Sequence, residues 1–514
     1  MKRTITKTNL SEVAAKGSIY TFLSLLIQKF GGLLFTVILA RLLLPELFGV
    51  YALVISIVTI AMTFTDLGIG TTGIRYISES LGKGNKKEGR SYARFFLKMK
   101  FALVLITIII LFAFSKYLSF SIYKNPFIYY PLIFSCFFII SESFREFFSG
   151  FFAIRKDLRP TVYFNLLLQI SKISFSVLAI LFLISEFEIS GLFLAFFVSS
   201  FITLLISLYI LLKKDKEFLL GKINKVDRFK INNYWKFMAI ATLSIAFFGS
   251  IDTLMLGGFV GTEYLAYYRV SLSLILAMSA IFPISTIFLP IFTQINKKRF
   301  HRGFQKTIRY ILIISIPATV GLLFIVKDLI SVIYGASYLS ATSSFYFLSL
   351  LIITTPLISL YSIILESKEK PKIVSNAVLI SLLANIILNY IAIRIFIFNP
   401  LWMIAGVGLA TTLSRIILLG ILIFYSKKDL GIKVKGIGLR KPIFSTSVMI
   451  VFLLLFNSLV EMNIFWGILE IILGVGVYLG TFLLVKGLNK DDWTLWRDLF
   501  KYRTKKNKKN YLSS

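Results

Sequence analysis

Fourteen apolar segments, each long enough to cross a membrane, dominate this sequence. A helix needs about 20 mostly apolar residues to cross roughly 30 Å of hydrocarbon. Hydrophobic residues make up 57% of the chain and the mean hydropathy is +0.83, well above a soluble protein. We therefore predict an all-α polytopic membrane protein with about 14 transmembrane helices, at residues 18–42, 47–67, 93–114, 126–151, 161–184, 190–212, 234–257, 264–292, 309–327, 343–366, 373–394, 402–425, 441–459 and 463–485.

The distribution of Lys and Arg gives this set of spans an orientation. With the N-terminus placed in the cytoplasm, 43 of the 57 basic residues fall in cytoplasmic segments and 5 in outer loops. The positive-inside rule then predicts a multi-pass protein of the plasma membrane with both termini cytoplasmic. An anionic inner leaflet accounts for the net charge of +33, so we expect the lipid bilayer and no nucleic acid as the partner of this charge.

The longest internal loop separates six spans from eight. A shift of 217 positions aligns residues 37–57 with 254–274, which are identical at four of 21 positions and include the pairs Glu46–Glu263 and Tyr51–Tyr268. Transporter folds often contain such internal repeats. The sequence therefore predicts two pseudo-symmetric six-helix lobes and two C-terminal helices, divided as residues 1–212, an inter-lobe cytoplasmic loop at 213–233, residues 234–425, residues 426–486, and a basic cytoplasmic tail at 487–514.

Residue types for enzyme chemistry are scarce. The single histidine, His301, and the single cysteine, Cys136, are too few for a His/Cys metal site. No phosphate-binding G-x-x-x-x-G-K-[ST] loop and no G-x-S-x-G or H-E-x-x-H motif occurs in the sequence. We predict no catalytic residues, no metal site and no cofactor, and hence no enzyme.

Polar side chains inside the spans are the candidates for function. Lys29 lies near the middle of the first span, where a charge costs roughly 2.5–3.5 kcal/mol. In the span at 161–184, Asn165, Gln169 and Lys172 follow one another at helical spacing and form one polar stripe. Such side chains are expected to face protein or water.

The deep charges are mainly positive, which favours an anionic ligand such as a phosphate or pyrophosphate. Asp252 is the acidic residue among them and is our candidate for a coupling-ion or proton site. The predicted substrate-binding residues are Lys29, Lys172, Arg269, Gln169, Asn165 and Arg415.

Structural roles compete with these assignments. Asp252 and Arg269 could form an ion pair in the second hairpin, and Asp66 could pair with Arg75. Polar residues of two further spans could pair among themselves or join helices by hydrogen bonds, namely Glu142, Arg145 and Glu146 in one span, and Asn385 and Asn389 in the other.

Several loose motifs, taken with the span count, resemble one family. They are ARLLLPELFGVY at 40–51, DLGIG at 66–70, SKEK at 367–370, the Asn385–Asn389 pair, and GVGLATTLS at 406–414. Over nearly its whole length the chain is similar to the polysaccharide transporter, or oligosaccharide flippase, family. That family belongs to the multidrug/oligosaccharidyl-lipid/polysaccharide exporter superfamily.

The resemblance implies a V-shaped pair of lobes around a central cavity. It also implies that the chain flips a polyprenyl-phosphate- or diphosphate-linked oligosaccharide to the outer leaflet by alternating access. Partners would be the lipid-linked oligosaccharide and a glycan polymerase or glycosyltransferases. Two alternatives stay open: a multidrug or cation antiporter of the same superfamily, which should rely on acidic cavity residues, and a membrane glycosyltransferase, which would need catalytic carboxylates in a large loop.

Overall fold

The computed structural model describes residues 7–487 except 156, 184–186, 221–225, 227, 280–296, 369, 432–437 and 461–463. Its regular structure in this part of the chain is helical throughout. The main helices are α1 (Lys7–Leu42), α2 (Pro45–Asp66), α3 (Ile69–Gly82), α4 (Lys86–Tyr117), α5 (Tyr129–Ile154), α6 (Arg159–Phe182), α7 (Glu188–Leu220), α8 (Arg228–Gly257), α9 (Thr262–Ser279), α11 (Lys297–Ile333), α12 (Thr342–Leu348), α13 (Leu351–Ser367), α14 (Pro371–Ile395), α15 (Pro400–Leu430), α16 (Arg440–Leu459) and α17 (Ile464–Leu484). Short helical turns lie at Leu118–Ile122, Pro126–Ile128 and Ala336–Ala341.

Twelve of the described helical segments are long and apolar enough to cross a membrane. A bent pair, Ala336–Leu348 with Leu351–Ser367, adds a thirteenth if its 45° bend lies within one span. The predicted span at 264–292 begins as α9, and its remainder lies outside the described residues. The prediction of an all-α multi-pass membrane protein is confirmed.

Two segments predicted as cytoplasmic loops are more helical than expected. Residues 69–82 form α3 directly after α2, and the inter-lobe loop at 213–233 is shortened because α7 continues to Leu220 and α8 begins at Arg228. Polar residues extend these helices beyond the apolar core of each span, where hydropathy alone gives no signal. The tail beyond residue 487 lies outside the described part of the chain.

Local sequence signals explain where several helices begin and end. Pro45 opens α2, where its missing N–H costs nothing, and Asn85 caps α4 by accepting a hydrogen bond from Glu88 N at 3.2 Å. Leu67 and Gly68 then turn the chain from α2 into α3 with φ of 43° and 75°. Glycine takes such a left-handed conformation without strain.

The Asp66 carboxylate holds this turn together. It accepts hydrogen bonds from Gly68 N and Gly70 N, both at 3.2 Å, and lies 3.3 Å from Nζ of the buried Lys100 on α4. The predicted pair with Arg75 is therefore wrong. The Arg75 guanidinium instead lies 4.2 Å from the ring centre of Tyr234.

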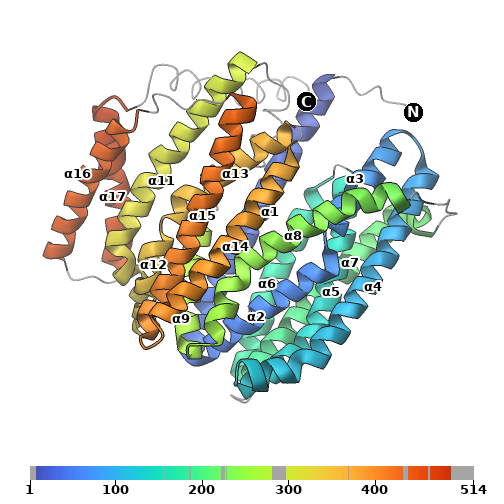
Figure 1. Cartoon of the computed structure of the whole chain (residues 1–514), viewed down its shortest axis with the longest axis horizontal. Helices are drawn as coiled ribbons and strands as arrows, with labels where there is room; N and C mark the ends of the chain where they lie inside the picture. Colours follow the sequence, from blue (N-terminus) through green and yellow to red (C-terminus); the bar gives the residue numbers. More distant parts are fainter. Residues whose placement is uncertain are drawn as a thin grey trace, which may run out of the picture. The chain divides into compact units, whose positions relative to one another are not determined.

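The chain divides into two compact units, residues 1–297 with 333–433, and residues 298–332 with 434–514. In the first unit α2 packs against α9, α5 against α7, and α14 beside α15 (Figure 1). At Gly49 of α2 the backbone of Thr262 comes so close that a Cβ atom would lie 1.7 Å from its carbonyl oxygen. Only glycine permits this contact between the two hairpins that the sequence repeat aligns.

The second unit is built from α11, α16 and α17, the last two lying side by side (Figure 1). Its apolar core contains Ile313, Met449, Leu453, Tyr478 and Phe482. Tyr478 also donates its hydroxyl proton to the Ile313 carbonyl at 2.6 Å, which joins α17 to α11. The predicted pair of pseudo-symmetric lobes stays a prediction.

Candidate functional site

The polar stripe of α6 faces α1. This position is expected, because polar side chains in a membrane span need partners within the protein. Asn165 donates a hydrogen bond to the Ser24 hydroxyl on α1. One turn further on, a Cβ atom at Gly31 would lie only 3.0 Å from Gln169 Cδ, so a glycine on α1 makes room for the amide. Gln169 Oε1 is buried and has no hydrogen-bond partner in the described part of the chain.

Lys172 ends this stripe in an aromatic setting. Its Nζ lies 4.2 Å from the ring centre of Phe35 on α1 and 4.3 Å from that of Phe196 on α7. Both rings are almost fully buried, so they form a low-dielectric wall on which the ammonium is held by cation–π attraction. Glu142 of α5 attracts this charge and Arg269 of α9 repels it.

Arg269 brings three of the predicted cations into one group. It acts electrostatically on Lys29 as well as on Lys172, although the three residues come from α9, α1 and α6. The Arg269 side chain also acts electrostatically on Tyr51 of α2, and its Nε is buried without a partner among the described residues. We call Lys29, Lys172 and Arg269 the lysine cluster.

A cavity of about 230 Å³ adjoins the lysine cluster at Lys172. Its charged lining is balanced, with Glu142 and Glu146 facing Arg145 and Lys172. Its other lining residues are Gln28, Phe138, Asn165, Leu168, Gln169, Phe196 and Ser199.

Within this cavity wall the predicted pairing on α5 is confirmed. Arg145 donates to both carboxylate oxygens of Glu142, at 2.6 and 2.5 Å, and lies 4.0 Å from Glu146. No pattern in the sequence indicated that Glu142 also attracts the charge of Lys172, because the two residues belong to different helices. Only the alignment of α5 with α6 across the cavity brings the two together.

Asp252 forms the centre of a second polar group, which we call the carboxylate cluster: Asp252, Tyr268, Asn389 and Thr411. The carboxylate accepts hydrogen bonds from the Tyr268 and Thr411 hydroxyls, each at 2.8 Å, and from Asn389 Nδ2 at 2.7 Å. All four residues are buried. The expected ion pair between Asp252 and Arg269 is wrong, because the tyrosine next to that arginine makes the contact instead.

The two asparagines of α14 join helices as predicted. Asn389 reaches Asp252 on α8, and Asn385 donates to Thr411 on α15 at 3.4 Å. Asn389 Oδ1 remains buried with no partner in the described structure. Polar side chains of three helices therefore meet around one buried carboxylate.

Arg415 belongs with the carboxylate cluster and not with the lysines. Its guanidinium carbon lies 3.7 Å from the ring centre of Phe248 on α8, and its charge is attracted by Asp252. The seven predicted site residues thus separate into two groups, with Arg415 and Asp252 in one and the other five in the second. No group of three His, Cys, Asp or Glu side chains that could hold a metal occurs in the part of the chain that was searched.

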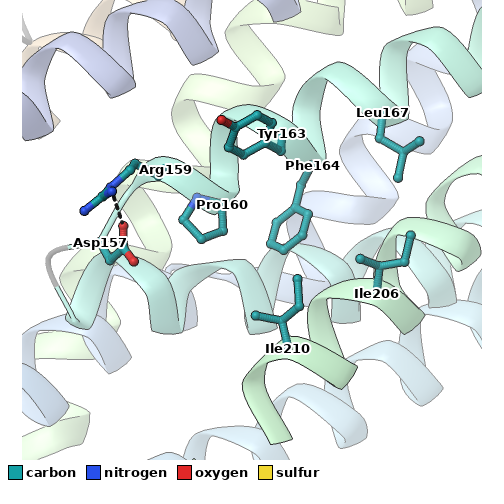
Figure 2. Close-up of a pocket in the computed structure, with 8 residues that line it drawn as sticks. All are labelled: Asp157, Arg159, Pro160, Tyr163, Phe164, Leu167, Ile206 and Ile210. Atoms are coloured by element: carbon teal, nitrogen blue, oxygen red, sulfur yellow. Dashed lines mark ion pairs between the residues drawn. The ribbon is translucent and has the colours of Figure 1, made fainter. Parts of the chain in front are cut away.

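A further cavity, of about 590 Å³, opens between the first turns of α6 and the later part of α7. Figure 2 shows its mainly apolar walls, which include Phe164 and Ile206, and the ion pair of Arg159 with Asp157 at 3.4 Å. None of the predicted site residues lines it.

Comparison with known proteins relates this chain to one family and to several solved structures. The model of the family described as "Polysaccharide biosynthesis protein" matches residues 38–343, more than half of the chain. A search of curated proteins found no match.

Solved structures share the fold at low sequence identity. A lipid II flippase MurJ in an inward closed conformation is 18% identical, with a TM-score of 0.65 over 95% of this chain and 100% of that one. A multidrug resistance MATE family transporter in an outward-facing conformation is 15% identical, with a TM-score of 0.58 over 82% and 96%. A transporter from Pyrococcus furiosus, described as having a binding pocket of reverse polarity, is 14% identical, with a TM-score of 0.55 over 82% and 95%. The MATE and Pyrococcus proteins are named as members of the MOP superfamily.

Proposed function

The chain belongs to the polysaccharide biosynthesis protein family, and from this premise we propose that it is a flippase for a lipid-linked oligosaccharide. The substrate would carry a polyprenyl phosphate or diphosphate and move from the cytoplasmic to the outer leaflet of the cell membrane. The fold supports a transport role, since it is shared with a lipid II flippase and with MATE transporters. The positive-inside pattern supports cytoplasmic termini.

The observation that carries the proposal is the lysine cluster. Arg269 repels both Lys29 and Lys172, which come from different helices, and Glu142 offsets only the charge of Lys172. Like charges destabilise each other, so an anion between them would relieve the repulsion. A phosphate or diphosphate supplies that charge, together with several acceptor oxygens for the lysine ammonium groups and the Arg269 guanidinium.

Neighbouring polar atoms extend this anion site toward a sugar. Gln169 Oε1 is a buried acceptor with no donor in the described part of the chain, and Asn165 and Gln28 also line the adjoining cavity. Sugar hydroxyls both donate and accept hydrogen bonds, so they match amide side chains better than an apolar drug does. The prenyl tail would stay in the lipid while the lobes alternate, so the protein replaces only the hydration of the headgroup.

Asp252 is our candidate for the coupling ion or proton. The Asn389 amide contacts it through Nδ2, and the Oδ1 atom of this amide is a buried oxygen with no donor among the described residues. Oxygen donors of this kind suit a hard cation such as sodium, and a proton on Asp252 is the other possibility. Either event would reduce the negative charge at Asp252 and so weaken its electrostatic attraction for Arg415.

A leaflet assay tests the proposal. The full chain is reconstituted in liposomes with a fluorescent prenyl-diphosphate oligosaccharide, and access of an external quencher to the label is followed. We expect the wild type to move the label across and Lys29→Ala to slow this by at least about tenfold, the equivalent of one charged hydrogen bond of roughly 1.5–3 kcal/mol. Lys98→Ala, which removes an exposed lysine of α4, should transport like the wild type.

The antiporter alternative makes the opposite prediction. It is favoured by one observation, the two carboxylates Glu142 and Glu146 in the cavity beside Lys172. If the wild type leaves the prenyl-linked label in place but exports a cationic dye along a sodium or proton gradient, the flippase proposal is overturned. Glycan polymerases and glycosyltransferases are proposed partners, which would supply or consume the flipped lipid.

A further inference from the structure

We infer that Glu470 of α17 is a proton-binding site, completed by Asn457 of α16 and Asp328 of α11. It lies wholly within the second compact unit, away from both polar clusters in sequence, and the inference does not rest on the proposed function. Glu470 is 1% exposed, and it is the sole charged residue in the sequence of α17. A carboxyl group in a spanning helix requires a specific partner or a proton.

Helix packing places Asn457 opposite Glu470. A Cβ atom at Gly474 of α17 would lie 3.1 Å from Leu453 Cδ2 of α16, which fixes where these two helices touch. Glu470 precedes Gly474 by four residues and Asn457 follows Leu453 by four, so each lies one turn nearer the connection between the helices. The Asn457 amide is accordingly within hydrogen-bonding reach of the Glu470 carboxylate.

The same comparison of helix contacts places Asp328 of α11 at the same height along the helices as Asn457 and Glu470. A Cβ atom at Gly321 of α11 would lie 3.3 Å from Met449 Cε of α16. Asp328 follows Gly321 by seven residues and Asn457 follows Met449 by eight, about two turns along each helix. Asp328 then acts electrostatically on Glu470, and its negative charge opposes a second one.

Two oxygen atoms at this point have no donor. Glu470 Oε1 and Asn457 Oδ1 are both buried without a hydrogen-bond partner in the described structure. A proton on Glu470 would make its carboxyl a donor to Asn457 Oδ1, while the Asn457 amide donates to the other carboxyl oxygen. One proton therefore satisfies both atoms and removes a buried charge, which is costly in hydrocarbon.

The basic residues of α11, α16 and α17 discussed next do not neutralise the Glu470 carboxylate. Lys327 neighbours Asp328, but its side chain is exposed. At the opposite end of the unit, Arg309 donates to the Gly487 carbonyl at 2.6 Å and Lys441 to the Lys486 carbonyl at 2.7 Å. Arg440 begins α16 beside Lys441, and Glu461 lies outside the described residues.

Infrared spectroscopy of the full chain in lipid nanodiscs tests the inference. We expect a carboxylic-acid C=O band at neutral pH that is lost in Glu470→Gln and kept in the control Glu263→Gln, which alters a glutamate in the first turn of α9. The thermal stability of the wild type should fall as pH rises through the titration of this band, because a buried charge then appears. Glu470→Gln, which keeps the shape and stays neutral, should lose this pH dependence.

Two results would overturn the proton site. The first is a carboxylic-acid band that is unchanged in Glu470→Gln. The second is a wild type that gains stability in sodium chloride over N-methylglucamine chloride at equal ionic strength, with the gain lost in Glu470→Gln, since a metal cation would then hold the oxygens. Asp328→Asn provides an independent variant, in which the band should disappear at a lower pH because the neighbouring negative charge is gone.

Discussion

The carboxylate cluster surrounds one charge with three hydrogen-bond donors, whereas in the lysine cluster Lys172 lies against two aromatic rings and Arg269 repels both lysines. Asp252 is 4% exposed and each of its contacts is 2.7–2.8 Å long. Lys29 is exposed, and Arg269 keeps a buried Nε without a partner in the described residues. The two clusters lie in the same compact unit.

This difference separates a charge whose hydrogen bonds join helices from charges to which the proposed function assigns a ligand. A buried carboxylate with matched donors joins helices, and α8, α9, α14 and α15 all contribute to its surroundings. Cations that repel one another do not stabilise the empty protein. Under the proposed function they gain a favourable interaction when an anion binds. We therefore expect the carboxylate cluster to affect folding as well as coupling, and the lysine cluster to affect mainly transport.

Removal of the central carboxylate should have the largest effect on stability. Asp252→Ala leaves the Tyr268, Asn389 and Thr411 donors facing an apolar gap. Loss of one partner from a buried charged network typically costs about 3–5 kcal/mol. The measurement is thermal unfolding of the purified protein, with Asp252→Asn as the control that keeps shape and acceptor oxygen. Equal unfolding temperatures for the wild type and Asp252→Ala would contradict a stabilising role.

The two tyrosines that the sequence repeat aligns allow a closer comparison. Tyr268→Phe removes a hydrogen bond to the buried Asp252 and should cost roughly 1.5–3 kcal/mol, the usual range for bonds to charged groups. Tyr51→Phe removes a hydroxyl on which Arg269 acts electrostatically. Because Arg269 is only half-buried and is solvated more easily, the cost should be smaller. Thermal unfolding of both variants measures the difference. A larger loss at Tyr51 would mean that the lysine cluster is the more structural of the two.

The sequence predicted the helices and the residue types better than it predicted their partners. Hydropathy and the positive-inside pattern gave nearly all of the spans, because a helix in lipid must satisfy its own backbone locally. Asn389 was correctly expected to join helices, but the pairs of Asp252 with Arg269 and of Asp66 with Arg75 were wrong.

Both errors have largely one physical cause. Partners were sought among residues near in sequence, and Tyr268 is indeed such a neighbour of Asp252. The other partners, Asn389, Thr411 and Lys100, are supplied by helices whose neighbours the fold alone determines. For the same reason, the sequence indicated the charge of Glu470 but not its partners. Its surroundings come from α11, more than a hundred residues earlier, as well as from α16.

Substitution of Lys172 should change stability least while it changes transport strongly. Lys172→Met keeps the length of the side chain and places a thioether against Phe35 and Phe196, where sulfur–aromatic contact is favourable. Lys172 is half-buried and forms no ion pair with another described residue, so we expect the free energy of unfolding to change by less than about 1 kcal/mol. Transport of the prenyl-diphosphate label should nevertheless fall by roughly tenfold or more, because a charged contact of about 1.5–3 kcal/mol is lost. Lys98→Met is the matched control. If Lys172→Met instead unfolds as readily as Asp252→Ala and a folded fraction still transports normally, the lysine holds the helices together through Glu142 and the contrast between the two clusters fails.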